Sequence, residues 1–168
     1  VIDIVARKLE HQGLRIHEPV VFRGTDCLFA SVCDALESVV PALDIPVASA
    51  RDVRRRLSRR LRTMLVELQP FLPAELQSQA AWDRRCSEYA AERMGDVWIL
   101  RAAAVEFRCR VHVVGRGATQ TFQPDDGVST YLPAPTTSRE IVLAYFDAVD
   151  YLHYASTRKI SGAGGNSR

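Results

Sequence analysis

The sequence has few cysteines, no long apolar run and no strong charge imbalance. Its 168 residues include four cysteines, none in a C-x-x-C pair with a matching partner, which argues against a disulfide scaffold and against a zinc site. The longest apolar stretches, such as residues 141–146, are far too short to cross a membrane. The net charge of +2 indicates no particular partner. We therefore expect free thiols in the cytoplasm, with no metal, no cofactor and no membrane contact.

The two ends of the sequence also lack familiar signals. Residues 1–4 show no basic region followed by an apolar core, so we expect no secretory signal. The first residue is Val1 rather than Met, which suggests a piece excised from a longer protein. Residues 161–168 are rich in glycine and serine, a composition typical of a flexible tail. The expected organisation is one domain over residues 1–160, followed by this tail.

Helical spacing of apolar residues fills the first two thirds of the chain. Ser49, with Asp52 three positions later, resembles a capping box that opens a long helix with an apolar stripe up to Leu68. Asp96 is placed to cap a later helix. The helices expected from this spacing cover residues 2–12, 27–40, 49–68, 74–92 and 97–107.

The period changes to two after residue 109, which indicates strands. Val111 and Val113 alternate with polar residues, and Gly115-Arg116-Gly117 marks a turn. Strands are expected over residues 110–114, 119–122, 141–146 and 151–156, with a shorter extended segment at 20–22. The fold class predicted from this order is α+β, with a helical N-terminal two thirds packed on a small C-terminal β-sheet.

Cys27 stands where a loop meets a helix, directly after Arg23-Gly24-Thr25-Asp26. Unpaired backbone N–H groups and the positive end of the helix dipole stabilise a thiolate at such a position. The N–H groups of Thr25, Asp26 and Cys27 could also hold the oxyanion that forms when a thiolate attacks a carbonyl. The alternative is that Cys27 is a small buried hydrophobe, as free cysteines commonly are.

The same choice between a catalytic and a structural role applies to the other three cysteines and to His153. Cys33, Cys86 and Cys109 do not join a loop to a helix start, so we expect them to be structural. His153 lies in an apolar strand between Leu152 and Tyr154, where a histidine needs a polar partner. It is either a satisfied core residue or a catalytic base.

Three segments, in order, resemble the ovarian tumour (OTU) family of cysteine deubiquitinases. Cys27-Leu28-Phe29-Ala30-Ser31-Val32 is similar to the nucleophile motif of that family. The segment 95–102 resembles its mid-chain helix, and 141–145 followed by His153-Tyr154 resembles its penultimate strand and closing His-Tyr. The resemblance covers nearly the whole chain and implies the papain-like OTU fold.

This resemblance implies a specific reaction and substrate. Cys27 would be the nucleophile and His153 the general base in hydrolysis of the bond after the C-terminal Gly-Gly of ubiquitin. Leu152 and Tyr154 would help to line a narrow substrate channel. The implied partner is ubiquitin or polyubiquitin, with ubiquitin-like modifiers as further candidates, and the expected protein is a monomer that needs no cofactor.

The chain departs from the family pattern at two places. The family has glycine two residues before the cysteine, where this chain has Thr25, and it commonly has Asn or Asp two residues after the histidine, where this chain has Ala155. The candidates for a third catalytic member are Asp26, Ser156 and Glu18. A plain Cys–His dyad is the remaining option.

Other functions stay open on the sequence alone. An OTU-like module could bind ubiquitin without cleaving it, or the domain could be a cysteine protease that processes a polyprotein. Seven arginines between residues 51 and 62 could bind nucleic acid. We instead expect these arginines to form a solvated helix face, with Val53, Leu57, Leu61 and Leu65 toward the core.

Overall fold

The computed structural model describes residues 2–17, 24–39, 49–124, 139–148 and 151–162. The segment expected at 20–22, the candidate Glu18 and most of the expected tail lie outside these residues. The helices are α1 (Ile2–Glu10), α2 (Cys27–Val39), α3 (Ala50–Arg62), α4 (Leu65–Leu68), α5 (Gln79–Ala91) and α6 (Val97–Phe107), with single 3-10 turns η1 (Gly24–Asp26), η2 (Gln69–Phe71) and η3 (Ala74–Leu76). The strands are β1 (Leu14–His17), β2 (Arg110–Val114), β3 (Gln120–Phe122), β4 (Glu140–Ala148) and β5 (Tyr151–Lys159).

Within the described residues, the strands form one mixed sheet in the order β1-β5-β4-β2-β3. β2 and β4 are parallel, while the β1–β5, β4–β5 and β2–β3 pairs are antiparallel. The register pairs Tyr145 with Tyr154 and Phe146 with His153. β5 therefore lies inside the sheet, between the first strand of the chain and β4.

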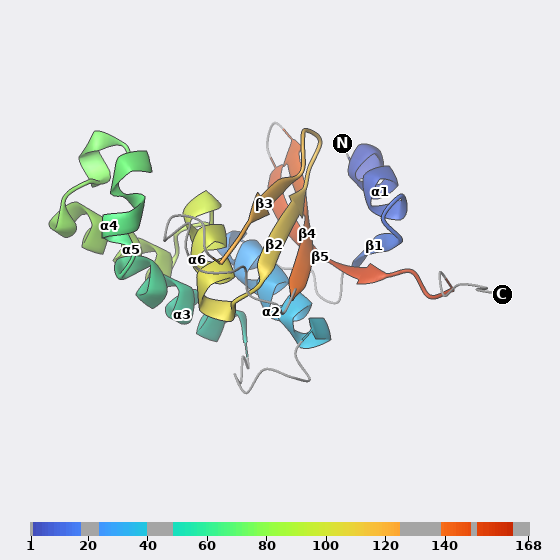
Figure 1. Ribbon diagram of the computed structural model, residues 1–168, viewed down its shortest axis with the longest axis horizontal. Coiled ribbons are helices and arrows are strands. Elements are labelled where there is room, and N and C mark those ends of the chain that lie inside the picture. Colours follow the sequence, from blue (N-terminus) through green and yellow to red (C-terminus); the bar gives the residue numbers. More distant parts are fainter. Residues whose placement is uncertain (1, 18–23, 40–48, 125–138, 149–150, 163–168) are drawn as a thin grey trace, which may run out of the picture.

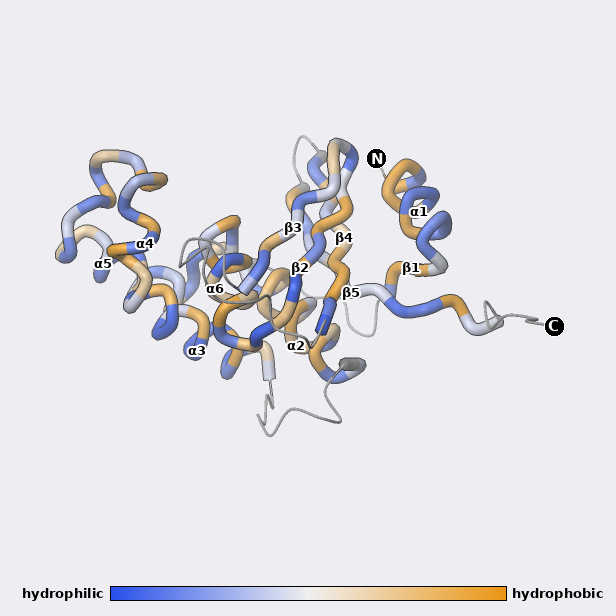
Figure 2. Tube along the Cα trace, in the orientation of Figure 1, coloured by the Kyte–Doolittle hydropathy of each residue, from blue (hydrophilic) through white to orange (hydrophobic). Residues whose placement is uncertain are grey.

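Helices cover both faces of this sheet (Figure 1). α2 and α6 pack on one face, and α3 and α5 extend that helical layer away from the strands. α1 lies on the other side, where Val5 and Leu9 form a smaller core with Phe146, Ala144 and residues around them. Figure 2 shows the hydrophobic positions of β2 and β4 along the centre of the molecule. The predicted α+β architecture is confirmed, with one helix added on the second face.

Apart from shifts of a few residues at the ends of elements, three features differ from the sequence-based expectation. The long helix expected over 49–68 is interrupted at Thr63, whose Oγ1 donates to the Arg60 carbonyl at 2.7 Å and whose backbone N–H caps the same turn. The chain expected to be helical over 74–92 contains η3 and then α5, which begins after the capping residue Ser78. No strand was expected before residue 20, but residues 14–17 form β1, which pairs with the far end of β5.

α1 is attached to the sheet by a lysine as well as by its apolar side. Lys8 Nζ donates to the carbonyl oxygens of Gly115 and Arg116, at 3.0 and 2.8 Å, and to that of Gly117. These carbonyls belong to the turn between β2 and β3, so one ammonium group joins the first helix to the middle of the chain. An ammonium group has three donors, and here each of them has an acceptor.

Candidate active site

Cys27 is the first residue of α2 and directly follows the 3-10 turn η1. Gly24 opens that turn with φ of +82°, a left-handed conformation that favours glycine. The loop therefore obtains its sharp turn from the glycine three residues before the cysteine, although Thr25 occupies the position where the OTU pattern has glycine. The Cys27 side chain is 1% exposed.

The first turn of α2 is attached to β5. Ser31 Oγ lies 2.7 Å from the Cys27 carbonyl and 3.0 Å from the Tyr154 carbonyl. Burial raises the pKa of Tyr145 and that of Tyr154, and Tyr154 lies in the same hydrophobic core as Cys27. The structure thus brings the predicted nucleophile next to the stretch of β5 that carries the predicted base.

His153 precedes Tyr154 on β5 and pairs with Phe146, with ring centroids 6.3 Å apart. Side chains alternate along a strand, and Phe146 and Ala155 belong to the core on the α1 side. Tyr154 instead belongs to the core that contains Cys27. His153 therefore follows the alternation of Ala155 on the α1 side of the sheet, whereas Cys27 belongs to the core on the opposite side, and only the β5 backbone at Tyr154 lies against the first turn of α2. The Cys27–His153 pair stays a prediction.

The other three thiols have environments typical of structural cysteines. All four cysteines are free and buried. Burial raises the pKa of Cys33, with the charge of Glu37 adding to it, and it raises the pKa of Cys86 to about 11 and that of Cys109 to about 12. Desolvated thiols of this kind remain protonated and are poor nucleophiles at neutral pH.

Of the three candidates for a third catalytic member, Asp26 and Ser156 are hydrogen-bonded to other groups, and Glu18 lies outside the described residues. Asp26 Oδ1 accepts from Arg54 Nη2 at 2.6 Å. Ser156 Oγ donates to Asp34 and lies 3.2 Å from the His17 carbonyl. Ser156 follows the alternation of Tyr154, not that of His153.

Leu152 and Tyr154 differ in their access to solvent. The Leu152 side chain is 52% exposed, and Tyr154 is 8% exposed. Leu152 is therefore available at the surface beside His153. Tyr154 packs against the Tyr145 ring, with centroids 4.7 Å apart, in the hydrophobic core that also contains Cys27.

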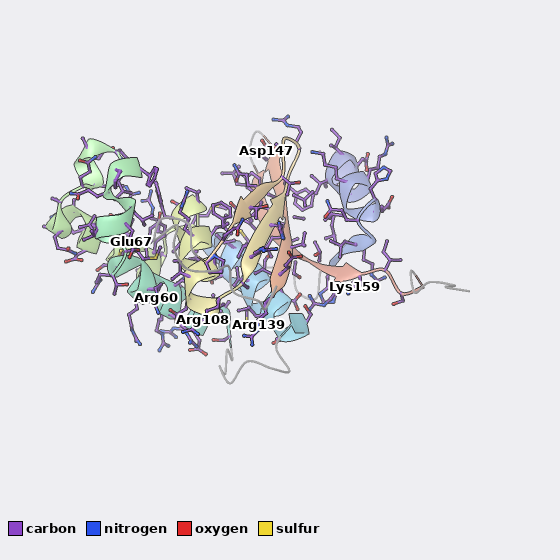
Figure 3. The ribbon with its side chains drawn as sticks, in the orientation of Figure 1. Arg60, Glu67, Arg108, Arg139, Asp147 and Lys159 are labelled. Atoms are coloured by element: carbon purple, nitrogen blue, oxygen red, sulfur yellow. The ribbon has the colours of Figure 1, made fainter. Side chains whose placement is uncertain are left out.

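Arg54 is the site residue that the sequence-based expectation missed. The arginines of 51–62 were expected to face solvent, but Arg54 is 3% exposed and donates to the loop before Cys27. The expectation fails because Arg54 and Ser58, four residues apart, flank the apolar stripe and turn inward with it. Arg55 and Arg59 are exposed as expected, while Arg60, labelled on α3 in Figure 3, is partly buried and donates to Glu106 on α6.

The segment before α6 closes against the start of α2. A Cβ at Gly95 would lie 2.5 Å from Leu28 Cδ2, so a larger residue there would require the Leu28 side chain to shift. Asp96 then caps α6, accepting from the Trp98 backbone N–H at 3.0 Å, and also accepts from the Tyr89 hydroxyl. The predicted cap is confirmed.

In the described residues, no cluster of three or more His, Cys, Asp or Glu side chains is placed to hold a metal ion. No described helix combines the length and the apolar character needed to cross a membrane. Around Cys27 the structure places a buried thiol at a helix start and the backbone N–H groups of η1, and the β5 backbone at Tyr154 lies against the first turn of α2.

Neither a protein-family model nor a curated protein matches the sequence. Solved structures do match. The OTU domain of OTUD1 superposes with a TM-score of 0.66 at 12% identity, over 94% of this chain and 93% of that one. The chain has an OTU fold. An OTU deubiquitinase from Wolbachia pipientis wMel matches with a TM-score of 0.61 at 13% identity, over 88% of this chain and 90% of its own.

A third OTU domain, solved in complex with ubiquitin, matches with a TM-score of 0.53 at 16% identity, over 86% of this chain and 69% of its own. The predicted resemblance is therefore confirmed at the level of the fold. In this OTU fold, α2 begins at Cys27, and β5, which lies between β1 and β4 in the sheet, carries His153.

Proposed function

We propose that this OTU-fold protein is a cysteine deubiquitinase with Cys27 as nucleophile and His153 as general base. The observation that carries the proposal is the position of Cys27: it opens α2 directly after a glycine-dependent turn, and Ser31 attaches that helix to β5 beside His153. Support also comes from the fold shared with an OTU deubiquitinase and with an OTU domain solved in complex with ubiquitin.

The proposed reaction transfers the ubiquitin acyl group to sulfur and then to water. His153 takes the proton of the Cys27 thiol, and the thiolate forms a C–S bond with the carbonyl carbon of the last glycine. Backbone N–H groups of Thr25, Asp26 and Cys27 stabilise the oxyanion. The C–N bond then breaks, and the lysine amine leaves with the proton from His153. Water, deprotonated by His153, releases the acyl group and restores the thiol.

A second candidate is a module that binds ubiquitin without cleaving it. Ala155 favours this candidate, because the residue two positions after His153 is apolar and packs with Ala144 and Phe146. It cannot fix the imidazole tautomer as a polar residue would. A polyprotein-processing cysteine protease would use the same site on another substrate.

The deciding experiment is reaction with ubiquitin that carries an electrophile at its C-terminus. We expect covalent labelling of the wild type and of Cys33→Ala, and no labelling of Cys27→Ala. A panel of diubiquitins then shows whether the labelled protein turns over. Binding of ubiquitin without labelling would favour the non-cleaving module, and labelling of Cys27→Ala would contradict the assignment of the nucleophile.

A further inference from the structure

Arg54 is a charged side chain buried in the core of an otherwise apolar helical layer. It lies on α3 and is 3% exposed, between Val53 and Leu57, which are fully buried. A buried guanidinium is costly unless its hydrogen-bonding groups are satisfied. The acceptors of the Arg54 guanidinium therefore show which segments of the chain it holds together.

Every N–H group of Arg54 has an acceptor. Nη1 donates to the Tyr89 carbonyl in the last turn of α5 and to the Arg93 carbonyl just after that helix, at 2.6 and 2.7 Å. Nε donates to Asp26 Oδ1 at 3.0 Å. Nη2 donates to Asp26 Oδ1 at 2.6 Å, to the Thr25 carbonyl at 2.9 Å and to Thr25 Oγ1 at 3.2 Å. The planar fork thus joins the end of α5 to the two residues that precede Cys27.

The same guanidinium also contacts α2 beyond the cysteine. Its Cζ lies 4.1 Å from the centroid of the Phe29 ring, within the range of a cation–π interaction. Arg54 therefore holds the chain on both sides of Cys27, at Thr25 and Asp26 before it and at Phe29 after it.

These contacts orient one backbone amide in particular. The peptide bond is planar and trans, so the Thr25 C=O and the Asp26 N–H point in opposite directions. Because the Thr25 carbonyl points at Arg54, the Asp26 N–H points away from it. Asp26 N–H is one of the donors expected to stabilise the oxyanion.

We propose that Arg54 is a positioning residue that sets the geometry of the Thr25–Cys27 backbone for catalysis. The proposal rests on the deubiquitinase function proposed above. Arg54 touches no reacting atom in this role. It acts through the peptide between Thr25 and Asp26, and its fork geometry is required, since a lysine offers one compact ammonium in place of a planar set of donors.

The test compares Arg54→Lys with Arg56→Lys. Both changes keep a positive charge on α3, but Arg56 donates to Glu106, away from Cys27. With a fluorogenic ubiquitin substrate, we expect Arg54→Lys to lower kcat by about tenfold to a hundredfold, the scale of a misplaced or lost oxyanion donor. KM should change by less than about threefold, and Arg56→Lys should keep wild-type kcat. A rise in KM without a fall in kcat would overturn the proposal.

Amide hydrogen exchange provides a readout that does not depend on activity. Peptides covering residues 24–30 should exchange faster in Arg54→Lys than in the wild type or in Arg56→Lys, at a temperature where all three are folded. Unchanged exchange in these peptides would overturn the Arg54 proposal even in an active enzyme. If the wild type neither cleaves nor labels, the deubiquitinase proposal fails, while exchange still decides whether Arg54 holds the loop.

A second variant, Asp26→Asn, tests the same contact if the Arg54→Lys protein does not fold. It removes the charge from a side chain that is 56% exposed and leaves Arg54 in place. We expect the same direction of change in kcat and in exchange, with a smaller magnitude, because the bonds to the Thr25 carbonyl remain. Wild-type kcat and exchange in Asp26→Asn, together with a failure of Arg54→Lys to fold, would assign Arg54 a purely structural role.

Discussion

All four cysteines are buried, so Cys27 is distinguished from the other three by its neighbours. Cys33, Cys86 and Cys109 lie where burial raises the thiol pKa. Cys27 lies at the start of a helix, where backbone N–H groups lack partners inside the helix. At the scale of single residues, this local geometry supports Cys27 as the proposed nucleophile.

The first prediction concerns this selection. Cys27→Ala should abolish hydrolysis of ubiquitin substrates and leave the fold intact, because the change removes little volume. Cys33→Ala, Cys86→Ala and Cys109→Ala should keep substantial activity. Turnover of diubiquitin measures the effect, and circular dichroism checks the fold. Full activity in Cys27→Ala would end the assignment.

The second prediction concerns the residue two positions after His153. Ala155→Asn restores the usual polar neighbour of the imidazole and should raise turnover or leave it unchanged. Ala155 is 5% exposed in the core on the α1 side, so the amide should lower the free energy of unfolding by about 1–3 kcal/mol. Steady-state kinetics and urea unfolding of the same protein measure the two effects, and a loss of turnover in folded protein would contradict the prediction.

At the scale of elements, α3 joins the parts of the helical layer. One side of it is apolar and packs on α2, α5 and α6. On its other side, Arg56 and Arg60 donate to the two oxygens of Glu106 at 2.7 and 2.6 Å. Burial tends to raise the pKa of Glu106, but these arginines outweigh it and lower the pKa below its usual range. Arg56 and Arg60 are thus paired within the fold, and the solvated part of the helix face is formed by arginines such as Arg55 and Arg59. The expectation that nucleic acid is not a partner stays a prediction.

The third prediction separates the two sides of α3. Leu61 is fully buried, so Leu61→Ala should lower the free energy of unfolding by about 2–5 kcal/mol. Arg55 is exposed, and Arg55→Ala should change it by no more than about 0.5 kcal/mol. Urea unfolding measures both. Equal losses in the two variants would show that the orientation of α3 is wrong.

At the scale of the whole molecule, Asp34 on α2 connects elements from both ends of the chain. It lies 3.0 Å from His17 Nδ1 on β1, accepts from Ser156 and lies 2.9 Å from Arg158 Nη2 on β5. Burial tends to raise the pKa of Asp34, but hydrogen bonds from Ser156 and His17 and the charge of Arg158 outweigh it and lower the pKa.

The fourth prediction follows from that direction. A carboxylate with a lowered pKa in the folded state stabilises the fold above its unfolded pKa of about 3.9, and this stability is lost as the pH falls through the folded pKa. Asp34→Asn should therefore have a lower urea midpoint than the wild type at pH 7. The difference should shrink below about pH 4 and disappear at lower pH. A difference that is independent of pH would contradict the role of the charge.

The local signals in the sequence were sufficient for most elements. Apolar spacing and the caps Ser49 and Asp96 predicted α2, α6 and the start of α3 closely, and the change to period two predicted β2 to β5. They also singled out Cys27, because a helix start is visible in the residues on either side of it. These features depend on neighbours a few positions apart in the chain.

Other features were decided by the tertiary structure, because their partners are distant in sequence. β1 has four residues and becomes a strand only by pairing with the end of β5, as in Leu14 with Lys159. Arg54 is buried because acceptors from η1 and α5 meet at its guanidinium. Short segments carry too little periodicity to indicate such pairings, and an arginine's burial depends on acceptors that only the folded chain assembles.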